Sequence, residues 1–174
     1  KRCELTHSER IDWLRLARTP QVGPVTFTKL IERYTSPAEA LESLPGLAAK
    51  GGRVKALNIV SRDEAEAELT ATEDFGARML MACEPDYPSL LAVLDPPPPV
   101  ISVQGVLHPD TAPCCALVGS RNASAIGVRF ARDLARELGL AGISIISGLA
   151  RGIDGAAHAG AIETGTIAVL ASGL

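Results

Sequence analysis

The side chains best suited to chemistry gather in two short glycine-containing segments in the second half of the chain. In the first, a hydroxyl, a guanidinium and an amide follow a glycine: Gly119, Ser120, Arg121 and Asn122. In the second, a hydroxyl and a guanidinium stand among small residues: Ser147, Gly148, Ala150, Arg151 and Gly152. Proteins bind phosphate with such groups and with exposed backbone N–H groups. We therefore predict a phosphate site for a mononucleotide, a dinucleotide or a nucleic-acid backbone.

Each segment stands between an expected strand and an expected helix. Apolar runs at 115–118 and 143–146 precede the two segments. A helix with one apolar face follows the first, and a small-residue helix beginning near Asp154 follows the second. The apolar residues of the first helix are spaced four apart: Ile126, Phe130, Leu134 and Leu138. The alternation predicts a Rossmann-like parallel α/β sheet with helices on both faces, with ligands outside the carboxyl ends of its strands.

Two common nucleotide motifs are absent from the sequence. No G-x-x-x-x-G-K-[ST] run occurs, which argues against a P-loop NTPase. The nearest approach to G-x-G-x-x-G runs through Gly148, Gly152 and Gly155, which is a different motif. The glycines have a structural alternative, in which they only tighten the turns, but a packing turn has no need of Arg121. We expect Arg121 first, and Arg151 second, to contact phosphate; a salt bridge is the alternative for Arg121.

Four runs resemble the DprA/Smf proteins of bacteria: VGSR (118–121), SGLARGIDGAAH (147–158), DYPSLL (86–91) and PPPPVISVQG (96–105). The resemblance is close over 77–174 and looser before it. It implies a cytoplasmic protein, without catalytic turnover or cofactor, that binds single-stranded DNA during natural transformation. It also implies that the protein protects incoming strands, delivers them to the recombinase RecA and forms a homodimer at full length. The sequence stops after an apolar run at 166–171, so we expect further strands and helices in a longer protein.

An enzyme or sensor of small nucleotides is the alternative function. LOG-type phosphoribohydrolases share a related fold and carry a PGG-x-GT-x-x-E run. The nearest match here, at 163–166, lacks the leading glycines and the downstream glutamate.

Asp154 and His158 lie one helical turn apart. With no nucleophile nearby in the sequence, we expect Asp154 to cap its helix and the two side chains to form an orienting pair that shapes the turn.

The first 75 residues are predicted to form a separate helical domain, followed by the Rossmann-like domain over 76–174. We expect helices at 8–18, 25–34, 37–44 and 62–72, with capping boxes at Ser36 and Ser61. The segment 20–41 is similar to a helix-hairpin-helix or SAM-like unit. In many such units a glycine hairpin binds a DNA phosphate, but Gly23 is followed here by a proline, which removes one donor. Packing or partner contact therefore stands beside DNA contact as its role.

Composition sets further bounds. The formal net charge is −3 and the pI is about 5.6, so any nucleic-acid site must rest on a local basic region rather than on global charge. The four cysteines form neither a metal spacing nor a secreted framework, and the three scattered histidines suggest no metal site. No signal peptide or membrane-length apolar run is present. For Tyr87 we prefer packing over stacking on a base.

Overall fold

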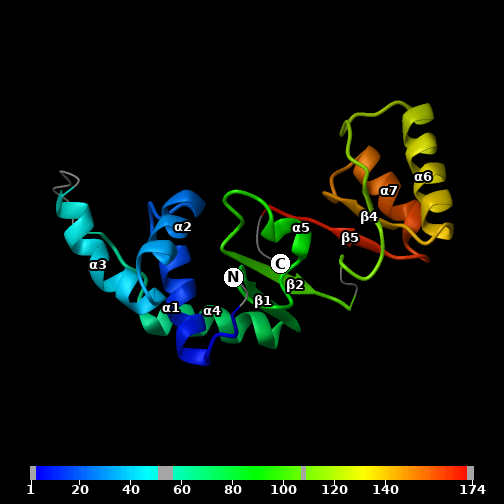
Figure 1. Cartoon of the computed structure of the whole chain (residues 1–174). Helices are drawn as coiled ribbons and strands as arrows, with labels where there is room; N and C mark the ends of the chain where they lie inside the picture. Colours follow the sequence, from blue (N-terminus) through cyan, green and yellow to red (C-terminus); the bar gives the residue numbers. More distant parts are fainter. Residues whose placement is uncertain (1–2, 51–56, 107–108, 172–174) are drawn as a thin grey trace. The chain divides into compact units, whose positions relative to one another are not determined.

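The computed structural model describes residues 3–50, 57–106 and 109–171. It divides into two compact units, Lys1–Gln104 and Gly105–Leu174, which Figure 1 shows in sequence colours. No helix in the described ranges is long and apolar enough to cross a membrane. Each unit has a hydrophobic core of its own, and each is described separately below.

Four helices build most of the first unit and confirm the predicted helical N-terminus. They are α1 (His7–Arg18), α2 (Pro24–Arg33), α3 (Pro37–Lys50) and α4 (Arg62–Asp74). Their apolar faces meet in one core, in which the Trp13 and Phe27 rings pack edge to face with centroids 4.9 Å apart. Since aromatic residues are few in this chain, aliphatic side chains fill the remainder of that core.

Helix N-termini in the first unit are capped by side chains. Ser61 forms the predicted capping box with Glu64, and Thr6 forms another with Glu9 that the sequence analysis did not predict. Hydrogen bonds from Ser61 lower the pKa of Glu64, as those from Thr6 lower the pKa of Glu9. At α3 the box is altered, because the carboxylate of Glu39 accepts from the N–H of Thr35 rather than that of Ser36.

The predicted end of α3 at Pro45 is wrong. The helix continues through this proline to Lys50. Pro45 lacks the N–H that would donate to the carbonyl of Leu41, and a proline ring also crowds the carbonyl four residues before it, so other contacts must stabilise the helix here. Burial of Leu41 and Leu44 in the core stabilises the helix on the N-terminal side of this defect.

An antiparallel pair of strands completes the first unit. Strand β1 (Ala77–Met81) pairs with β2 (Val100–Gln104), with Met81 opposite Val100. Met79 and Met81 are buried in the same core as the helices. This packing places both strands in the same compact unit as the helices, whereas the domain boundary predicted from the sequence lies before residue 76 and stays a prediction. The boundary between compact units therefore falls after Gln104.

Tyr87 lies in the connection between these strands, before the short helix α5 (Ser89–Ala92). Its side chain is 2% exposed, and its hydroxyl donates to the carbonyl oxygen of Pro98 at 2.8 Å. Burial raises the pKa of Tyr87 to about 12. The ring is therefore a packing element, as preferred, and is not available to stack on a base.

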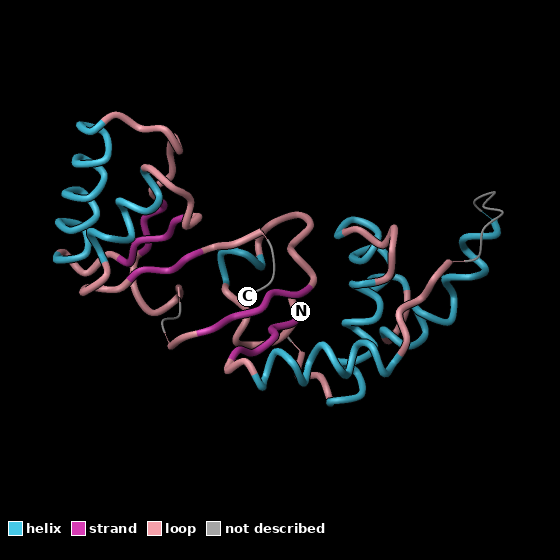
Figure 2. The backbone as a smooth tube through the Cα atoms, turned by 180° about the vertical axis from the view of Figure 1, so that it is seen from behind, coloured by secondary structure: helices cyan, strands magenta, loops and turns pink. Residues whose placement is uncertain are grey.

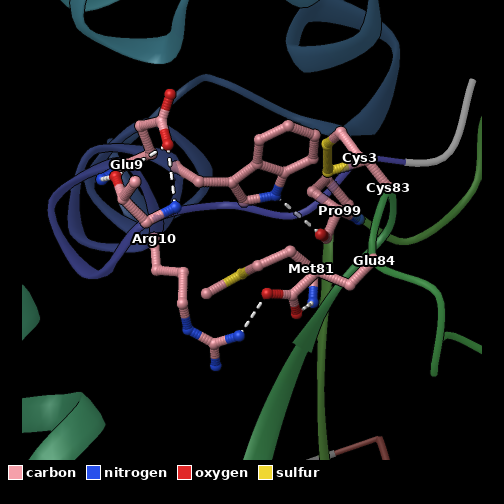
Figure 3. The surroundings of a disulfide bond; sticks show 9 residues. Cys3, Glu9, Arg10, Met81, Cys83, Glu84 and Pro99 are labelled. Carbon is pink, nitrogen blue, oxygen red and sulfur yellow. Dashed lines mark hydrogen bonds and ion pairs between the residues drawn. A yellow bond between two sulfur atoms is a disulfide. The ribbon is translucent and has the colours of Figure 1, made fainter.

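A disulfide joins Cys3 to Cys83, a pairing that no sequence motif predicted (Figure 3). The two residues are 80 apart in sequence, so their spacing matched no short motif. Folding of the first unit brings their Cα atoms to 5.3 Å, within the range of a disulfide. Cys114 and Cys115 are free thiols and lie in a strand of the second unit.

The second unit has the predicted parallel sheet. Its order is β3 (Cys114–Ala116), β4 (Ser144–Ser147) and β5 (Thr166–Ala168), with β4 in the centre. The connecting helices are α6 (Ala125–Leu140) and α7 (Ile153–Ala161). Figures 1 and 2 show α6 and α7 side by side. Both pack against Ile145 of the central strand, so within the described part of this unit they cover one face of the sheet rather than two.

The apolar face predicted for α6 is wrong in its N-terminal half. Ile126 and Phe130 are 82% and 67% exposed. The buried positions are instead the small residues Ala131, Ala135 and Gly139. Small side chains allow α6 and α7 to approach closely, so this stripe, and not the larger one, faces the neighbouring helix.

Candidate phosphate-binding site

Parallel pairing brings the two predicted segments to one edge of the sheet. Strands β3 and β4 run in the same direction, with Ala116 opposite Ile146. The segment after β3 and the segment after β4 therefore both leave the carboxyl edge, where α6 and α7 begin. We name these segments turn 1 (Leu117–Ser124) and turn 2 (Gly148–Gly152). Helix N-termini at such an edge carry partial positive charge and unused N–H groups.

Hydrogen bonds hold the two turns together. The N–H of Gly119 donates to Oδ1 of Asp154 at 3.2 Å. The N–H of Ile153 donates back to the carbonyl oxygen of Ser120 at 3.2 Å. At the strand ends, the hydroxyl of Ser147 donates to the carbonyl oxygen of Leu117 at 2.5 Å. These bonds form one backbone scaffold from two segments that α6 and β4 separate in the sequence.

The same scaffold requires glycine at its closest approach. Gly152 has φ +86°, which L side chains rarely adopt. A Cβ at this position would lie against the carbonyl oxygen of Ser120 and 2.8 Å from that of Arg121. A Cβ at Gly119 would lie 2.7 Å from the side chain of Ile153. The two turns thus touch backbone to backbone, and Gly152 has a packing role whatever it binds.

Arg121 and Arg151 project from this scaffold with their charges uncompensated. Both residues are exposed, and neither guanidinium forms a hydrogen bond or ion pair with another residue in the described ranges. The salt bridge considered as an alternative for Arg121 is therefore not formed within those ranges. Arg129 and Arg136 do have acidic neighbours, Asp133 at 3.9 Å and Glu137 at 3.0 Å.

Backbone donors lie beside these guanidinium groups. The N–H groups of Ser120, Arg121, Ala150 and Arg151 donate to no other residue that the structure describes. Asn122 is exposed, and its N–H donates to the hydroxyl of Ser120 at 3.1 Å. Two exposed cationic side chains and several backbone N–H groups on one edge can together hold an oxyanion.

Three predicted residues have positions that differ from their expected roles. Ser147 is buried, and its hydroxyl serves the carbonyl oxygen of Leu117, so it faces the scaffold rather than solvent. Asp154 is buried too, but its carboxylate bonds turn 1, and α7 has no side-chain cap. Gly148 packs against this carboxylate, since a Cβ there would lie 2.9 Å from its Oδ2.

The predicted pairing of His158 with Asp154 is wrong, because each side chain has another partner. Its Nδ1 lies 2.7 Å from the hydroxyl of Thr166, which itself donates to the carbonyl oxygen of Ile145 at 2.9 Å. Because that hydroxyl proton is committed, Nδ1 must carry the proton donated to Thr166. The Nε2 atom is buried, and no residue in the described ranges forms a hydrogen bond with it. His158 therefore ties α7 to β5.

Two contributors to the site were missed by sequence reasoning. Ser124 caps α6 by accepting from the N–H of Gly127 at 3.2 Å. A serine directly before an expected helix was a usable signal for this cap. Ile153 supplies the N–H that joins the turns, and a backbone donor leaves no trace in side-chain types.

The fold is that of a Rossmann-like α/β domain preceded by a small helical domain, and the candidate phosphate site lies at two adjoining βα turns. Family models agree in both parts of the chain. The DNA recombination-mediator protein A model matches residues 78–174, and the DprA-like N-terminal HHH domain model matches residues 7–71. The chain belongs to the DprA/Smf family of DNA processing proteins.

Individual relatives agree with this assignment. Protein Smf of Synechocystis is 30% identical over 98% of this chain and 46% of its own length. Protein Smf of Escherichia coli is 37% identical over 65% of this chain and 31% of its own. The crystal structure of DNA processing protein A from Streptococcus pneumoniae shares the fold, with a TM-score of 0.65 at 22% identity, over 97% of this chain and 58% of that one. The chain thus spans less than half the length of these two curated relatives.

Proposed function

We propose that this protein binds the phosphodiester backbone of single-stranded DNA at turns 1 and 2, without catalysis. The observation that carries the proposal is that two exposed guanidinium groups, Arg121 and Arg151, lie on one edge with backbone N–H groups, and that none of these groups is paired with another described residue. Phosphate contacts of this kind read no base sequence, so binding is expected to tolerate any sequence and to weaken with salt. Within its family, the protein would protect incoming strands and load RecA onto them.

The small-nucleotide alternative is disfavoured by the position of Glu163. The run 163–166, which most resembles the phosphoribohydrolase motif, connects α7 to the start of β5. In a parallel sheet this connection lies at the amino edge, opposite turns 1 and 2. Glu163 is therefore remote from the candidate phosphate site and cannot serve there as an acid or base.

The helical unit has fewer groups available for DNA contact at its hairpin than turns 1 and 2 have. Gly23 caps α2 and Pro24 occupies its first position, so the hairpin lacks one backbone donor. Arg18, one of the two nearest cations, is paired with Glu68 at 2.9 Å. We propose that this unit serves packing or partner contact, and that strand binding resides in the second unit.

Fluorescence anisotropy of a labelled oligo-dT, measured at several salt concentrations, tests the proposal. Arg121→Ala should weaken binding about tenfold or more, because it removes one charged hydrogen-bonding group. It should also reduce the slope of log K against log salt by about 0.7, which is the value for one phosphate contact on a single strand. Duplex DNA and AMP serve as competitors.

Arg136→Ala is the matched control. This arginine belongs to the same unit but lies three turns along α6, away from the carboxyl edge, and is paired with Glu137. Its removal should leave affinity within about twofold of wild type, as expected for an exposed charge outside the site. Equal losses for Arg121→Ala and Arg136→Ala would refute the site. AMP binding or cleavage in the absence of oligo-dT binding would favour the small-nucleotide function instead.

Protection and RecA loading need separate assays because binding alone does not imply them. Protection predicts that the protein slows exonuclease digestion of an oligonucleotide and that Arg121→Ala restores digestion. RecA loading predicts faster onset of strand-dependent ATP hydrolysis by RecA when this protein is present. Homodimerisation at full length is part of the same proposal and is tested by sedimentation.

A further inference from the structure

We propose that Cys3 and Cys83 form a reversible thiol–disulfide site that covalently clamps the N-terminal segment to the first unit. The two sulfurs are bonded in the structure, and the N–H of Cys3 also donates to the carbonyl oxygen of Cys83 at 2.8 Å. The backbones are therefore aligned by a hydrogen bond that does not depend on sulfur chemistry. Nothing in the proposed DNA site contributes to this pair.

The turn that carries Cys83 is held independently of the disulfide. The carboxylate of Glu84 forms an ion pair with Arg10 and accepts from the N–H of Met81 at 2.9 Å. Arg10 also donates to the carbonyl oxygen of Met79 at 2.8 Å. Figure 3 shows Arg10, Glu84 and the disulfide on the same end of β1. These contacts keep Cys83 in place when its sulfur is reduced.

Cys3 depends more strongly on the clamp. It lies before the capping box at Thr6, and the described residues hold it only through the disulfide and its single backbone bond to Cys83. Leu5 packs against the core, which keeps Cys3 near its partner after reduction. One thiol is thus on a fixed turn and the other on a short tether, an arrangement that favours re-formation of the bond.

Both cysteines are half-buried and so accessible to a small reagent. A low-molecular-weight disulfide, such as glutathione disulfide, is the class of oxidant that this site would take. One cysteine thiolate attacks the reagent, forms a mixed disulfide and releases one thiolate. The second cysteine thiolate then attacks the protein sulfur of the mixed disulfide and releases the other. Two protein thiols are oxidised, one reagent disulfide is reduced to two thiols, and two protons pass to solvent or to the released thiolates.

The clamp closes a loop that contains α1 to α4, so its state should affect the stability of the whole first unit. Cross-linking a long loop restricts the unfolded chain and stabilises the folded one. The single tryptophan, Trp13, lies in this core and donates to the carbonyl oxygen of Pro99 at 2.9 Å. Its fluorescence therefore reports unfolding of the unit that the clamp stabilises.

The test is to equilibrate the protein in glutathione buffers of graded redox ratio, alkylate the free thiols and measure mass. Two of the four cysteines should disappear together as oxidant rises, with Cys3 linked to Cys83 in the peptide map. Cys114 and Cys115 are the internal control, because they stay free in the structure and should be alkylated throughout. The unfolding temperature of the first unit, measured by Trp13 fluorescence, should fall by about 10 °C on reduction.

Cys3→Ser should unfold at the reduced temperature whatever the redox ratio, whereas a Cys114→Ser, Cys115→Ser double variant should retain the full shift. If Cys3→Ser does not fold, thiol counting on the wild-type protein still decides the matter. The proposal is overturned if all four thiols remain free at every ratio, if another pair forms, or if reduction leaves the Trp13 transition unmoved. Since oligo-dT affinity is not a readout here, failure of the DNA proposal would not affect this result.

Discussion

Gly152→Ala should destabilise the second unit through the turns that meet at this glycine. Two costs combine at this position. The first is backbone strain, since φ is +86° and a non-glycine residue there costs about 1–3 kcal/mol. The second is steric, because the new Cβ would lie against the carbonyl oxygen of Ser120 and 2.8 Å from that of Arg121. Turns 1 and 2 must separate, which breaks the bond from Ile153 to Ser120, worth about 1 kcal/mol. We expect a total of about 2–4 kcal/mol.

Gly142→Ala is the matched control for the strain alone. Gly142 has φ +80°, lies in the same unit, and would place a Cβ in open space. Its replacement should cost about 1–2 kcal/mol, the ordinary penalty for a left-handed L residue. The difference between the two variants therefore reports the contact between the turns together with the difference in backbone strain at φ +86°, ψ −124°.

Urea unfolding with two probes measures both variants. Far-UV circular dichroism reports both units, whereas Trp13 fluorescence reports only the first. Gly152→Ala should lower the circular dichroism transition of the second unit and leave the Trp13 transition in place. Equal midpoints for Gly152→Ala and Gly142→Ala would refute the close contact of the turns. A shift in the Trp13 transition would show that the effect is not confined to the second unit.

Three further predictions use the same probes. Asp154→Ala should destabilise the second unit by about 1–3 kcal/mol, because the N–H of Gly119 loses its acceptor, as measured by the circular dichroism midpoint in urea. Gly160→Ala should cost about 1–3 kcal/mol in the same assay, because a Cβ there would strike a backbone carbonyl of α6. Tyrosine in an unfolded chain ionises near pH 10, and burial raises the pKa of Tyr87 to about 12. The protonated Tyr87 side chain should therefore contribute fully to the free energy of unfolding of the first unit below about pH 10, and this contribution should be lost progressively toward pH 12. Tyr87→Phe should show a smaller loss of stability across this pH range, measured by Trp13 fluorescence.

Local sequence signals predicted most of the elements. Ser61 and Glu64 marked a helix start through the types and spacing that a capping box needs, and the structure has that box. The two apolar runs before turns 1 and 2 form parallel strands. Their signal was also local, because each run ends at a glycine or serine turn before a helix. Such signals depend on neighbours within about four residues, which is the range over which sequence patterns are most informative.

Features that depend on contacts between distant residues were predicted less well. A four-residue spacing of large apolar residues placed Phe130 on a buried face, but small residues decide which face of α6 contacts α7. The helix break expected at Pro45 failed because packing on either side of a proline is invisible to local propensity. The disulfide between Cys3 and Cys83 escaped notice because only folding brings positions 80 apart together. Each miss concerns a tertiary contact.

Within the SG-x-A-x-GID run, the structure separates residues that shape the turns from residues that can reach a ligand. Gly148, Gly152 and Asp154 contact turn 1, and their removal should reduce stability first. Arg151, like Arg121 in the other turn, contacts no described acidic group and should affect binding with little effect on folding. A motif match alone cannot distinguish these roles, because both require the same residues at the same spacing. The decisive pattern is therefore a pair of arginine variants that melt like wild type yet bind oligo-dT weakly, beside a glycine variant that melts early.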